Sequence, residues 1–413
     1  MNFAAVATLA TVYRTIGQVM LALVAIGFVV YVVVNVVFAG KPEVGSEIEV
    51  APNRKPYFED EVLEGPKLDR ALTWGLLTLF VLAIGLPLYW VMEPGRQENA
   101  ARDFGRKFAD RGAELFAPTE EGGFNCAFCH GGMDAAGNAI NYNLTEPDGS
   151  VSPVLWRAPA LNAVLLRYSR EEVTFILTYG RPGTPMPAWG VAGGGPLNDQ
   201  QVQNLVDYLE SIQIGPEEAQ QAVADRLEQY LDAVDENGNP LFASEGEALF
   251  NMGLLDDFAG GAYACARCHT SAWSHTQIEP VDANGDGAPD QSAGGGLVFN
   301  RDELDAILDI SGCGGALGPN LCGGDTTRQF PTEQDHLDFV TTGSEVGKGY
   351  GRTGQGSGKM PGFGQRPSEK PLFWIDENQP RDFPIENVDN AAQNSGMLTP
   401  DQIQSIVDYE RGL

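Results

Sequence analysis

The sequence predicts a mostly α-helical protein in which two N-terminal transmembrane helices precede two tandem copies of one soluble domain. Two long apolar runs lie near the start of the chain, and the residues after them are soluble in character. The soluble part carries one plan of motifs twice, in the same order. A length of 413 residues is too great for one ordinary domain, so we expect several cores.

The predicted membrane anchor is residues 1–98. Its apolar runs, at 16–39 and 71–92, are each long enough to cross the hydrocarbon layer as a helix. The first run is much longer than the apolar part of a secretory signal, so we expect it to be retained. Basic residues are concentrated in the loop between the runs, which predicts a cytoplasmic loop and outward-facing termini. The sequence therefore predicts a multi-pass protein of the inner membrane with its soluble part on the periplasmic side.

The charge of the chain limits its partners. The formal net charge is -30, from 56 acidic and 26 basic side chains. Such a chain is a poor partner for nucleic acid or anionic lipid headgroups. A basic protein partner fits the charge, and so does a merely well-solvated surface.

Each soluble copy has four parts. They are a short helix with Gly and Phe four residues apart, a Cys-x-x-Cys-His run, a Gly- and Pro-rich loop with a Met-Pro pair, and a closing helix with a tyrosine. In the first copy, residues 99–215, these are Gly112 and Phe116, Cys126 to His130, Met186, and Tyr208. In the second copy, residues 235–413, they are Gly246 and Phe250, Cys265 to His269, Met360, and Tyr409. Residues 216–234 between the copies read as a charged connecting helix.

The two Cys-x-x-Cys-His runs predict covalent haem c. Two thiols at this spacing can form thioethers with the haem vinyl groups, and the following imidazole can reach the iron. The runs supply Cys126, Cys129 and His130 in the first copy, and Cys265, Cys268 and His269 in the second. A zinc site is the alternative, but it would have to join the two pairs or find ligands among only 4 histidines. The sequence therefore predicts two haems.

The methionine of each loop is the candidate for the second axial ligand. Met186 and Met360 are both followed by proline in corresponding loops, whereas most methionines merely fill cores. His/Met ligation raises the reduction potential and closes the iron against substrates. A long insertion separates His269 from Met360, so Met397 and His336 are alternative ligands for the second haem.

Four further residues are predicted to support the haems. The carbonyls of Pro159 and Pro319 are well placed in sequence to accept a hydrogen bond from the second ring nitrogen of each histidine. Arg181 and Trp189 flank Met186 and are candidate donors to haem propionates. The alternative for Arg181 is an ordinary surface position.

The insertion in the second copy contains two other features. Asp282, Asn284, Asp286 and Asp290 alternate with small residues as in a calcium-binding loop, although the bidentate glutamate of such loops is missing. An Asp- and Gly-rich surface turn is the alternative. Cys313 and Cys322 are the two remaining cysteines, and in an oxidising compartment we expect them to form a disulfide.

Taken together, these motifs resemble those of class I cytochrome c domains, across both soluble halves. The resemblance implies two helical haem domains that transfer electrons. The layout is also similar to the di-haem c subunits of cytochrome bc complexes and of cbb-type haem-copper oxidases. It implies as partners a cytochrome b with a Rieske protein, a haem-copper oxidase, or both, and we favour transfer from a quinol-oxidising bc complex to a terminal oxidase. A di-haem peroxidase or a dehydrogenase subunit is the competing class, and either needs one iron with an open position.

Overall fold

The structure, a computed structural model, confirms a mostly helical chain and describes only part of it. Contacts divide the chain into two units, residues 1–97 and 98–413. The described residues are Leu23, 26–31, 33–34, 65–145, 148–292, 294–310, 314–315, 317–344, 349–352, 354–355, 360–365 and 395–413.

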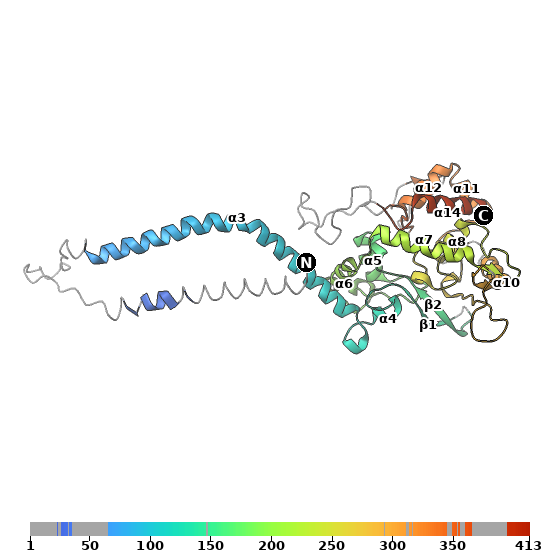
Figure 1. Cartoon of the computed structure of the whole chain (residues 1–413), viewed down its shortest axis with the longest axis horizontal. Coiled ribbons are helices and arrows are strands. Elements are labelled where there is room, and N and C mark those ends of the chain that lie inside the picture. Colours follow the sequence, from blue (N-terminus) through green and yellow to red (C-terminus); the bar gives the residue numbers. More distant parts are fainter. Residues whose placement is uncertain are drawn as a thin grey trace, which may run out of the picture. The chain divides into compact units, whose positions relative to one another are not determined.

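A single helix, α3, runs from Pro66 to Phe116 and is the longest element in Figure 1. It contains both the second predicted span and the first helix of the repeat as one continuous helix, whereas the sequence placed them in separate segments. Residues 93–102, between these two parts, are also helical. Ion pairs one turn apart support the helix there, between Arg96 and Glu93 and between Arg102 and Glu98.

Within the described residues, α3 is the one helix long and apolar enough to cross a membrane. The first predicted span lies mostly outside them. The two-span anchor and its orientation therefore stay predictions.

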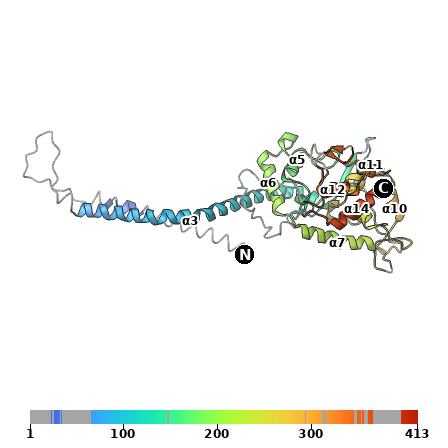
Figure 2. The same cartoon turned by 90° about the horizontal axis from the view of Figure 1, so that it is seen from above.

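The first half of unit 98–413 is built around the end of α3. Two short elements, η2 and α4, precede an antiparallel hairpin, and two longer helices follow it. The elements are η2 (Thr119–Glu121), α4 (Cys126–His130), β1 (Asn138–Thr145), β2 (Val151–Ala158), η3 (Val164–Leu166), α5 (Arg170–Tyr179), η4 (Val191–Gly193) and α6 (Asp199–Ser211). Helices α5 and α6 lie side by side (Figure 2).

Helix α7 (Pro216–Asp232) begins with a proline in its first turn and leads into the second half. The longest helix there is α14, which packs against α8 and α12 (Figure 1). The elements are β3 (Val234–Asp235), α8 (Glu245–Phe250), η5 (Phe258–Gly261), α9 (Ala266–His269), η6 (Trp273–His275), β4 (Val298–Phe299), α10 (Arg301–Ile310), α11 (Asp325–Gln329), α12 (Glu333–Thr342), β5 (Gly349–Tyr350), β6 (Gly354–Gln355) and α14 (Pro400–Gly412). The predicted domain boundaries stay predictions.

The Gly and Phe of each repeat form a close crossing of two helices. A Cβ on Gly112 would lie 1.9 Å from the carbonyl oxygen of Asn204 in α6, so only glycine lets α3 approach this closely. The Phe116 ring packs on Tyr208 at 5.1 Å between centroids. Both closing helices start with a complete capping box, at Asn198 and Thr399.

The second half repeats this crossing with α8 and α14. A Cβ on Gly246 would lie 1.9 Å from the carbonyl oxygen of Ser405. Phe250 packs on Tyr409 at 5.3 Å between centroids. The two pairs of helices therefore meet in the same way, and the matching sequence positions make the same contacts.

The β1–β2 hairpin was not foreseen from the sequence. Its strands pair in register from Asn138 with Ala158 to Thr145 with Val151. The hairpin packs on η5 and η6 of the second half, where Arg157 is 1% exposed. The Arg157 guanidinium donates to the carbonyl oxygens of Leu254, Trp273 and Thr276 and pairs with Asp257 at 2.6 Å. The hairpin thus joins the two halves through a buried arginine.

Candidate haem sites

The first Cys-x-x-Cys-His run forms the short helix α4, with the imidazole of His130 turned inward and 8% exposed. Its Nδ1 lies 2.8 Å from the carbonyl oxygen of Pro159, one of the two carbonyls singled out from the sequence. This contact leaves Nε2 as the nitrogen that can reach an iron. Burial lowers the pKa of His130 to about 4, which keeps the ring in the neutral form that binds metals.

The second run repeats this arrangement. The imidazole of His269 is also 8% exposed, and its Nδ1 lies 2.9 Å from the carbonyl oxygen of Pro319. A Cβ on Gly318 would lie 2.6 Å from the His269 ring. Glycine is therefore needed where this loop passes over the imidazole.

All four thiols of the two runs are free. Burial raises the pKa of Cys126 to about 12 and raises those of Cys129 and Cys265 as well. A raised pKa keeps a thiol protonated, which disfavours thiolate redox chemistry. Among the described residues, no three or more His, Cys, Asp or Glu side chains are placed to hold a metal ion together.

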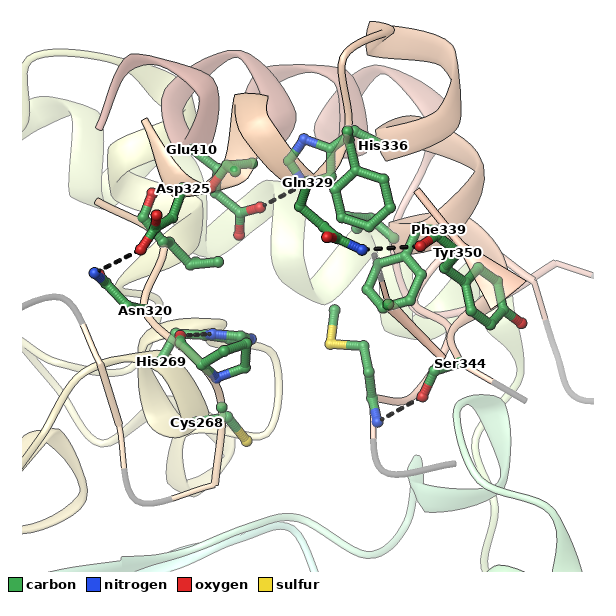
Figure 3. A pocket seen from close by; sticks show the side chains of 18 of the residues that line it. Cys268, His269, Asn320, Asp325, Gln329, His336, Phe339, Ser344, Tyr350 and Glu410 are labelled. Atoms are coloured by element: carbon green, nitrogen blue, oxygen red, sulfur yellow. Dashed lines mark hydrogen bonds and ion pairs between the residues drawn. The ribbon is translucent and has the colours of Figure 1, made fainter. Parts of the chain in front are cut away.

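A cavity of about 940 Å³ opens beside the second run, at the upper end of the size range of cofactor pockets. His269 and Cys268 lie on one side of it, and Phe339, Tyr350 and Ser344 lie on the other (Figure 3). The remaining wall combines apolar residues, which a porphyrin face requires, with polar and charged ones. The apolar residues include Leu317, Leu321, Phe330, Val340 and Pro361, and the polar and charged ones include Asn320, Asp325, Arg328, Gln329 and Arg352. Met360 also lines this cavity.

The two methionine loops share one local geometry. Each follows a helix, α5 or α12, that ends at a left-handed glycine, Gly180 with φ +70° and Gly343 with φ +75°. The next residue donates its backbone N–H to the methionine carbonyl, from Arg181 to Met186 at 3.0 Å and from Ser344 to Met360 at 2.9 Å. Met360 is therefore the structural counterpart of Met186, despite the insertion.

The alternative ligands for the second site lie elsewhere. Met397 is fully buried in the core and does not line the cavity. His336 does line it, but its Nε2 pairs with a carboxylate oxygen of the buried Glu410 at 3.0 Å (Figure 3). Its ring stacks on Phe330 at 5.1 Å between centroids. Of the three candidates, Met360 is the one that both lines the cavity and has no competing partner for its side chain among the described contacts.

Arg181 and Trp189 lie at different sites in the structure. The Trp189 ring packs against the first core and meets Phe124 edge-on at 5.8 Å. Arg181 donates to the hydroxyl of Tyr168 at 3.1 Å and lines the cavity of the second site. The sequence had associated both residues with the first haem, and only proximity in space could reveal the position of Arg181.

The calcium and disulfide predictions are not supported further. Asp282, Asp286 and Asp290 accept hydrogen bonds from backbone N–H groups of their own loop, as in a surface turn, and so does Asn284. Cys313 lies outside the described residues, so the bridge to Cys322 stays a prediction.

Comparison with known families bears on the first half. Residues 108–209 match the family model of cytochrome c oxidase, cbb3-type, subunit III. They form a c-type cytochrome domain. No curated protein matches the chain, and no solved structure does. The matched segment contains the helix crossing, α4, Pro159 and the Met186 loop, so the haem c site described above lies wholly within it.

Proposed function

We propose that the chain is a membrane-anchored cytochrome with two haems c, which transfers electrons within a respiratory complex of the inner membrane. The repeated proximal geometry carries this proposal. His130 and His269 each follow two thiols, are equally buried, and bind a proline carbonyl through Nδ1. Because the second half reproduces the arrangement found within the segment that matches the cytochrome family, we infer a second haem there.

The residues that would hold each haem divide the work in the same way. The cysteines would anchor the vinyl groups, and the histidine would bind the iron from the proximal side. Met186 and Met360 would bind it from the opposite side, because their loops are alike. A haem supplies reversible one-electron chemistry, and His/Met ligation sets a high potential. The apolar residues of the second cavity would contact the porphyrin face and favour the same outcome.

The site supports electron transfer in preference to peroxidase or dehydrogenase chemistry. Peroxidase chemistry needs an iron with an open or easily displaced ligand, whereas both halves here offer a methionine on a loop fixed at a left-handed glycine. A low-spin spectrum with methionine-to-iron charge-transfer absorption from both haems is the expected result. One high-spin haem, or reaction of one haem with added peroxide, would favour the enzyme.

Two complexes are candidates. In the first, which we propose, the chain transfers electrons from a quinol-oxidising cytochrome bc complex, with its cytochrome b and Rieske protein, to a terminal oxidase. In the second, the chain is the di-haem subunit of a cbb-type oxidase, and the family match favours this assignment. Gentle solubilisation and mass spectrometry of the companion subunits separate them. A cytochrome b with a Rieske protein supports the first, and a haem-copper subunit without them supports the second.

Substitution of the methionines tests the ligand assignment. Met186→His and Met360→His should each leave two haems attached and lower the potential of one haem, because a second imidazole replaces a thioether. Spectroelectrochemical titration measures this, with Met252→Leu, in the buried core of the second half, as the control. An unchanged potential in either histidine variant would mean that its methionine is not a ligand.

Two accessory features remain part of the proposal. A disulfide between Cys313 and Cys322 would stiffen the loop that carries Pro319, and thiol counting under denaturing conditions tests it. Calcium at Asp282 to Asp290 would be structural. A melting temperature unchanged by a chelator would remove calcium from the proposal.

A further inference from the structure

Three arginines from separate segments gather where the two halves meet. Arg167 follows η3, Arg181 follows α5, and Arg267 lies in α9 between the two cysteines of the second run. The guanidinium groups of Arg167 and Arg181 lie 5.3 and 5.4 Å from the centre of the Tyr168 ring. Arg167 donates to the carbonyl oxygen of Ala262, and Arg267 donates to that of Gly260 in the same segment. The three form one cationic group, called the arginine cluster below.

The cluster has no carboxylate partner among the described residues. Arg167 is 7% exposed, donates to the carbonyl oxygen of Ala262 at 2.5 Å, and has an Nε without a hydrogen-bond partner. Arg267 donates only to carbonyl oxygens, at 2.7 and 3.1 Å. Arg181 donates to the hydroxyl of Tyr168. Three cations, one buried and two half-buried, therefore have only neutral acceptors among the described residues.

Other buried arginines of the same unit are paired. Arg157 has Asp257, and Arg170 has both Asp207 and Glu210. Leaving a buried charge uncompensated costs free energy, and bringing several like charges together increases that cost. The contrast indicates that an anion from outside the polypeptide completes the arginine cluster.

The cluster touches both haem sites. Arg267 belongs to the second run, yet it donates to the carbonyl oxygen of Arg157 at 3.1 Å, two residues before the proline whose carbonyl binds His130 in the first. Arg181 comes from the methionine loop of the first half, yet it lines the cavity that contains His269. The anion must therefore be one that both sites bring to this point. Haem propionates meet that condition, and a guanidinium can bind a carboxylate through two parallel N–H groups.

We propose that Arg167, Arg181 and Arg267 form one anion site that binds propionates of both haems at the boundary between the halves. The inference rests on the proposed function, because it needs both haems. A positive charge near an iron favours its reduced form, which carries one charge less. If the cluster binds propionates of both haems, the removal of one guanidinium should lower both reduction potentials. A site that bound the propionates of a single haem would change only that haem's potential.

Arg267→Gln in the full chain, purified in detergent, is the direct test. The position between the cysteines tolerates any residue, so the thioethers should still form. Spectroelectrochemical titration should show both midpoint potentials lowered, each by at least a tenfold change in the ratio of reduced to oxidised haem at fixed potential, about 59 mV for one electron. Arg226→Gln is the control, because Arg226 pairs with Asp256 at 2.7 Å outside the cluster, and its potentials should stay unchanged.

Two further variants keep the test decisive. Arg267→Lys retains the charge and should restore most of the potential. Arg181→Gln, at a half-buried position, replaces Arg267→Gln if that variant does not fold. Two haems with unmoved potentials, or with only one moved, would overturn the shared site and leave the proposed function intact. A haem count below two in the unaltered protein would instead overturn the proposed function.

Discussion

The two halves of unit 98–413 keep the same contacts around the haem motif and differ in the chain between them. From His130 the chain reaches Pro159 by way of the β1–β2 hairpin, and from His269 it reaches Pro319 through the longer insertion. In both cases the proline carbonyl arrives at the same ring nitrogen. The comparison teaches that the contacts around the Cys-x-x-Cys-His runs are kept in both halves, whereas the segments that connect them differ and can take on other roles.

In the first half, the connecting segment is the β1–β2 hairpin, which joins the two halves. Its disruption should have the largest effect on stability. Arg157→Leu should lower the free energy of unfolding by about 3 kcal/mol, because it leaves Asp257 and three carbonyl oxygens of the second half without their donor. Urea titration of the full chain in detergent, followed by haem absorption, measures this. Arg328→Leu is the control, since the exposed pair of Arg328 with Asp325 contributes little. Equal stability of the two variants would show that the hairpin does not hold the halves together.

Disruption of the helix crossings should cause the next largest loss of stability, and the loss should be equal in the two halves. Gly112→Ala and Gly246→Ala each place a Cβ where a backbone oxygen now lies 1.9 Å away. Since the helices must move apart, each variant should lose about 1–3 kcal/mol of stability. Gly412→Ala meets nothing within 4 Å and should be neutral in the same urea titration. A large loss in only one of the halves would break the correspondence between them.

Loss of the hydroxyl groups of the closing tyrosines should have the smallest effect on stability, and this effect should differ between the halves. The hydroxyl of Tyr208 donates to the carbonyl oxygen of Met133, whereas no hydrogen bond of the Tyr409 hydroxyl is found among the described residues. Tyr208→Phe should therefore cost about 1 kcal/mol, and Tyr409→Phe should cost close to nothing. Thermal melting of both variants provides the measurement. Similar costs at the two positions would mean that the rings stabilise by packing alone.

The features predicted correctly from the sequence are those that depend on residues close together in the chain. The Cys-x-x-Cys-His runs, the Gly and Phe four residues apart, and the proline carbonyls are local patterns, and the contacts described follow from them directly. The continuity of α3 was missed, because the sequence becomes soluble in character from Asn99 onward, and this change predicted a new domain there. The helix continues across the change and accommodates both Pro87 and Pro94. Alternation of Ile140, Tyr142 and Leu144 before the turn residues Asp148 and Gly149 could have revealed the hairpin.

The remaining features required knowledge of distant neighbours. Arg157 is separated by about a hundred residues from the carbonyls that it binds, and no local pattern marks it as buried. The same is true of the arginine cluster, because no local sequence pattern marks its members as neighbours. The pairing of His336 with Glu410 brings α12 onto α14. These contacts result from tertiary packing, which overrides what a single segment suggests.

The boundary between the halves also imposes an order on biogenesis. Ala160, next to the carbonyl that binds His130, donates its N–H to Ala259 at 2.9 Å, and a Cβ on Gly260 would lie 1.9 Å from the carbonyl oxygen of Ala158. The segment that faces the first histidine is therefore finished by residues made about a hundred positions later. During synthesis from the N-terminus, this segment therefore stays uncovered until residues 259 and 260 have been added, just before the second Cys-x-x-Cys-His run.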